Sequence, residues 1–153
     1  MKTRFKHLFP LLLAAAFILG ACKKDPEVDL TDPVPVILDV AVSTTSVVEY
    51  QDEIVFEVSY RDGDGDLGEN EPNAANLYLI DNRIAVTETY RIQELAPDGA
   101  VIPITGTLRV VLPSTGITDG SSSQTVTYTI YLRDRAGNES NRFTTDAITV
   151  RQN

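Results

Sequence analysis

Residue types that carry much side-chain chemistry are scarce in this sequence. Its 153 residues include one cysteine, one histidine and no tryptophan, and both Cys22 and His7 lie near the N-terminus. A disulfide within the chain is excluded, because it needs a second cysteine. No window of helical length shows apolar residues at a 3.6-residue period, so the sequence does not predict a helical core.

The N-terminal segment has the pattern of an export signal. Lys2, Arg4 and Lys6 give it positive charge, and an apolar run follows from residue 8 to residue 19. About a dozen residues are too few to cross a bilayer, which takes roughly 20, so residues 1–21 are predicted to be a signal peptide. Its removal takes His7 with it, which excludes histidine acid–base chemistry and imidazole metal ligands from the mature chain.

The predicted cleavage point resembles the bacterial lipobox. Residues 19–22 read Leu-Gly-Ala-Cys, with small residues before the cysteine. The resemblance implies that Cys22 is acylated, with chains such as palmitate, and becomes the new N-terminus. Acyl chains contribute about 0.8 kcal/mol per buried methylene, so two or more give a stable membrane anchor. The alternative, a buried free cysteine, fits poorly with the polar residues 23–27 that follow.

Residues 22–35 are predicted to form a flexible tether, because they are charged and contain three prolines. Lys23 stands where inner-membrane lipoproteins of enterobacteria carry aspartate, so the resemblance implies an outer-membrane location. The acidic residues of the tether also resemble the export signals of Bacteroidota surface lipoproteins. They are Asp25, Glu27, Asp29 and Asp32. A plain solvated tether is the alternative interpretation.

The charge of the mature chain limits its partners. Removal of residues 1–21 leaves 132 residues, enough for one domain, with 10 basic and 22 acidic side chains and a net charge of −12. Such a surface repels nucleic acid and anionic lipid headgroups, so neither is an expected partner.

Residues 36–153 are predicted to form an all-β domain, because apolar side chains recur there at every second position. Three inward faces are expected: Val36-Leu38-Val40-Val42, Ile54-Phe56-Val58-Tyr60 and Val126-Tyr128-Ile130-Leu132. In the second of these segments, Glu57, Ser59 and Arg61 are expected to point outward. The expected strands are 36–42, 52–61, 77–81, 83–95, 101–112, 124–133 and 142–150. Segments 83–95 and 101–112 are expected to pair as a long hairpin through the turn 96–100. About seven short strands predict an immunoglobulin-like antiparallel β-sandwich.

The C-terminal region strengthens this prediction by resemblance. Residues 131–141 read Tyr-Leu-Arg-Asp-Arg-Ala-Gly-Asn-Glu-Ser-Asn. They resemble the turn between strands F and G of bacterial immunoglobulin-like and fibronectin-III-like domains, in which a D-x-A-G-N-x-S sequence recurs. The resemblance implies that residues 124–133 are strand F and that Asp134 begins the turn after it.

One segment has the composition of a metal site. Residues 62–71 read Asp-Gly-Asp-Gly-Asp-Leu-Gly-Glu-Asn-Glu, which allows alternate aspartates to converge on one point. Like charges 4 Å apart repel by roughly 4 kcal/mol at an effective dielectric of 20, and a hard cation reverses that sign. Calcium fits best, because it takes 6 to 8 oxygen ligands in adaptable geometry. An acidic solvated turn without an ion is the alternative.

The segment differs from an EF-hand, because Leu67 and Asn73 stand where that motif needs glycine and glutamate. It resembles the calcium-binding Asp/Gly loops of β-sandwich domains, particularly in Bacteroidota lipoproteins with a D-G-D-G-D-L-G sequence. If 52–61 is strand B and 124–133 is strand F, the loops after them emerge at the same end of the sandwich. The predicted ligands are Asp62, Asp64 and Asp66, with Asp134 and with Glu69 or Asn138 added.

These patterns predict a protein without catalytic activity. The expected function is that of a calcium-stabilised cell-envelope lipoprotein with an adhesive, scaffolding or accessory role, whose partner is an envelope protein or glycan. The alternative is a surface module that binds glycans or peptides for nutrient uptake, which would use exposed aromatic rings. The candidate rings for that alternative are Tyr78, Tyr90 and Tyr131.

Overall fold

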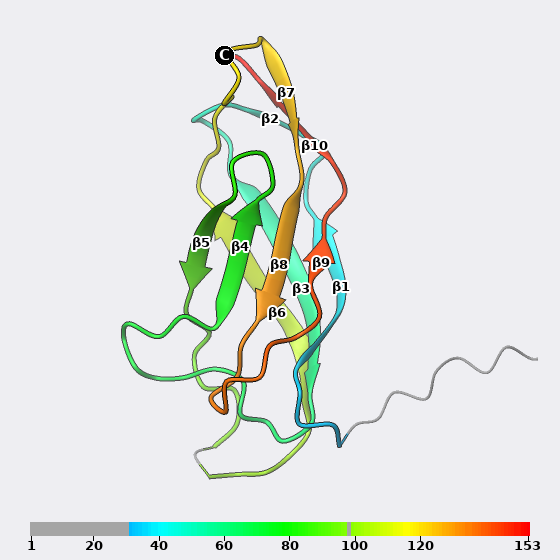
Figure 1. Cartoon of the computed structure of the whole chain (residues 1–153), viewed down its shortest axis with the longest axis vertical. Coiled ribbons are helices and arrows are strands. Elements are labelled where there is room, and N and C mark those ends of the chain that lie inside the picture. The colour runs from blue at the N-terminus through cyan, green and yellow to red at the C-terminus, as the bar shows by residue number, and fades with distance from the viewer. Residues whose placement is uncertain (1–30, 98) are drawn as a thin grey trace, which may run out of the picture.

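The computed structural model describes residues 31–97 and 99–153 (Figure 1). Cys22 and the predicted signal peptide lie outside these residues, so their assignment stays a prediction. The described part of the chain is built from strands and loops. It includes no helix of a length and hydropathy that could span a membrane.

The first layer of the fold is a three-stranded antiparallel sheet. It contains β1 (Val36–Val42), β3 (Ile54–Asp62) and β6 (Ile104–Leu112). β3 is the central strand and pairs with both neighbours. Its inward residues have strong strand propensity and alternate with polar ones, which suits a sheet with one buried face.

The second layer is a four-stranded sheet in the order β5 (Val86–Tyr90), β4 (Leu77–Asp81), β8 (Tyr128–Leu132) and β9 (Phe143–Thr144). Three strands extend it lengthwise, namely β2 (Ser46–Val48), β10 (Ile148–Arg151) and β7 (Ser123–Val126). Only Thr127 separates β7 from β8, so the pair follows one path (Figure 1). β2 pairs with β10 in parallel, and the other pairs are antiparallel.

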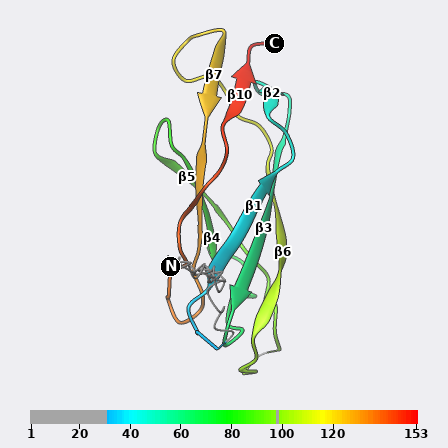
Figure 2. The same ribbon diagram turned by 90° about the vertical axis from the view of Figure 1, so that its right-hand side faces the viewer.

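This topology is that of an immunoglobulin-like β-sandwich. The first layer corresponds to strands A, B and E of that fold, in the order β1, β3 and β6. The second layer corresponds to strands C′, C, F and G, in the order β5, β4, β8 and β9–β10. The two layers face each other in Figure 2. The predicted fold class is therefore confirmed.

The core lies between the layers and is filled by the predicted faces of β3 and β8. Phe56 and Tyr128 meet edge to face across it, with ring centroids 5.4 Å apart and an interplanar angle of 73°. The fully buried side chains of both layers surround this pair. They include Ile54, Val58, Leu77, Leu79, Ile130, Leu132, Ile148 and Val150.

The predicted hairpin of 83–95 with 101–112 is wrong. β5 pairs with β4 in the second layer, whereas β6 pairs with β3 in the first. A turn does form, since the Ala100 N–H donates to the Pro97 carbonyl at 2.9 Å. It lies within a connection that carries the chain from one layer to the other, so β5 and β6 do not pair.

Two local predictions fail at single side chains, although Val40 and Val42 of the predicted β1 face do pack into the core. A register shift between Ile37 and Asp39 in β1 turns Ile37 inward and leaves Leu38 49% exposed. A bulge of this kind inverts the alternation beyond it. Arg61, predicted to point outward, is only 6% exposed, and its Nε and Nη1 make no hydrogen bond.

Candidate metal centre

The acidic loop begins where β3 ends and folds back under the sandwich. Leu67 is fully buried and closes this end of the core. The loop packs so closely on its neighbours that a Cβ at Gly63 would collide with the Asp32 carbonyl, and one at Gly65 with the Ile102 carbonyl. Gly65 also has a φ of 76°, a conformation that favours glycine. The glycines are therefore required by packing, and the loop is an internal part of the domain.

Three carboxylates converge inside this loop. Asp62, Asp64 and Asp66 each offer an oxygen, and these oxygens lie within 4.8 Å of one another. Hydrogen bonds hold two of these carboxylates in place: Asp62 Oδ2 accepts from the Leu67 N–H at 2.8 Å, and Asp66 Oδ2 accepts from the Ala136 N–H at 3.0 Å. Asp62 is fully buried, and its Oδ1 and the Oδ1 of Asp66 have no hydrogen-bond partner.

The electrostatics of the site disfavour three negative charges without a cation. Burial raises the pKa of Asp62 to about 6, aided by the charges of Asp64, Asp66 and Asp134 and opposed by the Leu67 N–H. Burial likewise raises the pKa of Asp66, aided by Asp134 and Asp64. Both shifts arise because ionised carboxylates are poorly solvated and repel one another there. A bound cation would offset both causes, because it would coordinate the carboxylate oxygens in place of water and neutralise their repulsion.

The turn after β8 lies against this loop, as the predicted strand order required. The Arg135 N–H donates to the Asp66 carbonyl at 3.4 Å, and Arg135 Nη1 donates to the Gly68 carbonyl at 2.8 Å. Asp134 is 5% exposed and close enough to raise the pKa of both Asp62 and Asp66. The shared location of the two loops is therefore confirmed.

The remaining predicted ligands lie farther out. Asn138 donates from its backbone N–H and its Nδ2 to the two oxygens of Asp134, at 2.7 and 2.8 Å. It is thus a partner of Asp134, outside the group of three carboxylates. Glu69 lines a separate open hollow beside Glu94 and Arg135.

Several neighbours of the site carried no recognisable signal in the sequence. The backbone of residues 31–32 lies against Gly63, and the Ile102 N–H donates to the Asp64 carbonyl at 3.1 Å. Arg135 brings a positive charge near Asp66, which opposes the rise of the Asp66 pKa, and its Nη1 lies 3.8 Å from Glu94 Oε1. Its position directly after Asp134 was the one available hint.

Comparisons with known proteins give the chain no family. No known family and no curated protein matches it. Among solved structures, it is similar to a Niemann-Pick type C2 protein from Japanese carpenter ant, with a TM-score of 0.42 and 9% identity over 78% of this chain and 93% of that one. This likeness is too remote to indicate a function.

Proposed function

We propose that this protein is a non-catalytic lipoprotein of the outer membrane whose domain is stabilised by calcium, and that it has an adhesive, scaffolding or accessory role. The observation that carries the calcium site is the buried, unpartnered Oδ1 of Asp62, in a group whose carboxylate oxygens lie within 4.8 Å of one another. Buried polar atoms without partners are rare in folded proteins, and each one needs an explanation. A cation at this point supplies it.

The donor set fits calcium. The converging atoms are all carboxylate oxygens, and Asp134 adds a further buried carboxylate nearby. Calcium takes such ligands in adaptable geometry, whereas magnesium needs a near-ideal octahedron. Asp62, Asp64 and Asp66 would hold the ion, which would supply positive charge and cross-link the loop.

The position of the site indicates which parts of the chain this cross-link would hold together. Asp66 binds the turn after β8, and Gly63 touches the backbone where the described chain begins. The site therefore joins the base of the predicted tether to two loops of the sandwich. In a protein anchored through Cys22, this is the end that bears any force between the domain and the membrane.

The glycan-binding alternative has less support. Tyr78 and Tyr131 stack on each other with centroids 4.5 Å apart and an interplanar angle of 4°. The Arg133 guanidinium covers the Tyr78 ring at 5.4 Å, and that of Arg142 covers the Tyr131 ring at 4.0 Å. Both faces of this pair are thus occupied within the protein. A sugar needs a free ring face, so these tyrosines do not form a stacking platform.

Thermal unfolding with and without calcium tests the proposal. We expect millimolar calcium to raise the melting temperature of the mature chain above its value in EDTA, because a ligand that binds only the folded state stabilises it. Asp64→Asn should abolish most of that rise. Glu57→Gln is the matched control, since it removes a charge from an exposed position on β3. Equal calcium responses in the two variants would contradict the proposed site.

Labelling of growing cells with an alkynyl fatty acid tests the anchor separately. The wild-type protein should take up the label and fractionate with the outer membrane. Cys22→Ser should lose both properties, because the acylated atom is absent. Labelling that survives the substitution would rule out this anchor without affecting the calcium experiment.

A further inference from the structure

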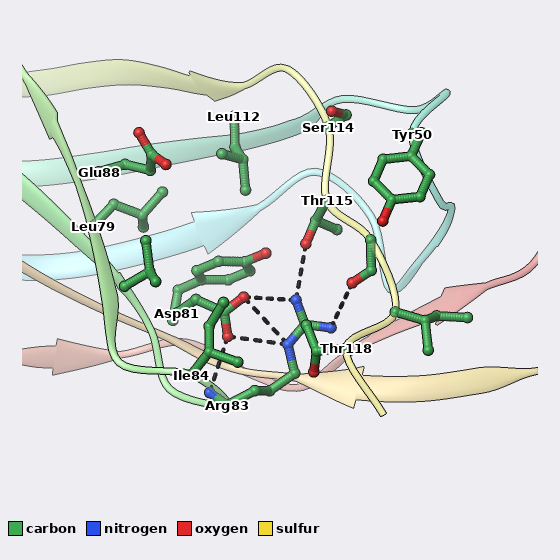
Figure 3. A pocket seen from close by; sticks show the side chains of 14 residues that line it. Tyr50, Leu79, Asp81, Arg83, Ile84, Glu88, Leu112, Ser114, Thr115 and Thr118 are labelled. Atoms are coloured by element: carbon green, nitrogen blue, oxygen red, sulfur yellow. Dashed lines mark hydrogen bonds and ion pairs between the residues drawn. The ribbon is translucent and has the colours of Figure 1, made fainter. Parts of the chain in front are cut away.

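A cavity of about 210 Å³ opens between the layers, far from the candidate metal centre. β4, the turn after it, the end of β6 and the segment 114–118 form its walls (Figure 3). Along the β4–β8 ladder, Asp81 pairs with Tyr128 at the cavity end, and Leu77 pairs with Leu132 at the end nearest Asp134. The cavity and the carboxylates therefore lie at opposite ends of the sandwich.

A partly buried ion pair fixes the polar wall of the cavity. The Arg83 side chain is 9% exposed and contacts the Asp81 carboxylate through Nε at 3.0 Å and Nη2 at 2.6 Å. The remaining donors reach the Gly116 carbonyl, Gln124 Oε1 and Thr115 Oγ1 at 2.9–3.0 Å, as Figure 3 shows in part. The two charges thus satisfy each other and their neighbours. The wall is rigid, and it offers no free charge to a ligand.

The rest of the lining is mixed: Glu88, Ser114 and Thr118 are polar, and an apolar part extends to an exposed rim. Tyr50 is 72% exposed, Ile84 49% and Val86 48%. Deeper apolar walls come from three further side chains. These are Leu79, Leu112 and Ile117. Exposed apolar groups that line a concave site are typical of ligand entrances.

Backbone strain is concentrated at the same rim. Tyr50 has a φ of 58° and Ala85 a φ of 54°, and in the described chain these are the non-glycine residues with positive φ. Ala85 lies between the rim residues Ile84 and Val86. The Tyr50 ring packs so closely on Gly116 that a Cβ there would collide with its hydroxyl. Strained residues of this kind cluster at functional sites, where the surrounding structure holds them in place.

A polar atom inside the cavity wall lacks a partner. Tyr128 lines the cavity and is 2% exposed, and its hydroxyl lies beside the Thr115 hydroxyl without a hydrogen bond of good geometry. The hydroxyl lies near Thr115, Asp81 and Arg83, all of which also line the cavity. Burial raises the pKa of this hydroxyl, so it is a neutral donor at physiological pH. A phenylalanine would fill the same space without an unpartnered oxygen, so the hydroxyl needs a role.

We propose that this cavity binds a small neutral molecule, with an apolar body about the size of one ring and one hydroxyl or carbonyl group that pairs with Tyr128. The volume limits the size, because pockets for drug-sized ligands measure about 300–1,000 Å³. The mutually satisfied ion pair offers no counter-charge to a ligand, and Glu88 in the lining repels an anion. Because Glu88 is exposed and hydrated, it attracts a cation only weakly, so the site favours a neutral ligand. This proposal does not rest on the calcium site.

Cyclohexanol is the probe that tests this proposal, and two-dimensional amide NMR of the mature chain detects its binding. We expect saturable shifts at the amides of Ile84, Thr115 and Ile117 at millimolar cyclohexanol. Cyclohexanecarboxylate, with the same ring and a charge, should bind at least tenfold more weakly. Absence of saturable shifts at these amides would overturn the proposal and leave the cavity filled by solvent only.

Two variants locate the binding. Tyr128→Phe should weaken cyclohexanol binding about three- to tenfold, which corresponds to the loss of one hydrogen bond. Val86→Trp should abolish it by filling the mouth, whereas Val101→Trp is the control, since Val101 is 79% exposed and does not line the cavity. Unchanged affinity in Tyr128→Phe, or shifts that persist in Val86→Trp, would refute the assigned site.

Discussion

Replacing Asp62 with asparagine should stabilise the protein in the absence of calcium. The asparagine side chain would keep the shape of the aspartate and an oxygen to accept from the Leu67 N–H, but it carries no charge. Asp62 is fully buried, and its pKa rises from 3.8 to about 6 in the fold. Such a rise in the pKa of Asp62 corresponds to about 3 kcal/mol at pH 7, where the carboxylate is ionised in both folded and unfolded states.

The sign of this effect depends on pH. Because the folded pKa is the higher one, the folded protein binds the proton more tightly, and the free energy of unfolding of the metal-free protein falls as pH rises from about 4 to about 6. Below pH 4 the aspartate is neutral in the fold, so the advantage of Asp62→Asn should disappear. Above pH 6 the advantage should be complete.

Urea unfolding of both proteins in EDTA and in calcium measures these differences. In EDTA at pH 7 the variant should have the higher free energy of unfolding, by about 2 to 3 kcal/mol. In calcium the wild type should gain about 2.7 kcal/mol when the free ion is at 100 times its dissociation constant, while the variant gains little. A variant less stable than wild type in EDTA, or one that gains equally from calcium, would refute the reasoning.

Three further substitutions have expected outcomes that urea unfolding can check. Tyr128→Phe should raise the free energy of unfolding by about 1 kcal/mol, since it removes a buried hydroxyl without a partner; a loss of stability would show that the hydroxyl is paired. Gly65→Ala should lower the free energy of unfolding by more than about 3 kcal/mol. Gly120 has a similar φ of 74° but open space around it, so Gly120→Ala should lower the free energy of unfolding by about 1 kcal/mol. Equal decreases in the two variants would contradict the packing of the loop. Arg83→Met should lower the free energy of unfolding by about 1.5–3 kcal/mol, because the partly buried Asp81 carboxylate loses the charged hydrogen bonds from the Arg83 side chain; a decrease below about 1 kcal/mol would mean that the ion pair is not fixed.

The strands could be predicted where one face is buried and the other is not. Segments 54–60 and 126–132 alternate in burial as their sequences indicate. Strand pairing was harder, because the turn at 96–100 is compatible with a hairpin or with a crossing between layers. The choice depends on which sheet has room for each strand, and β6 finds its partner in β3, far away in the sequence.

The candidate site was predictable in outline only. Alternating Asp and Gly residues indicated that Asp62, Asp64 and Asp66 converge, and the strand order placed Asp134 near them. The depth of burial could not be predicted, since it comes from backbone at positions 32 and 102. The cavity was missed for the same reason, because segments remote from one another in the sequence build it.

A high-resolution crystal structure of the mature chain grown in calcium tests the central claim most directly. We expect an anomalous peak among Asp62, Asp64 and Asp66, with oxygens of all three at about 2.3–2.6 Å from the ion. Water alone among these oxygens, at hydrogen-bond distances, would contradict the account.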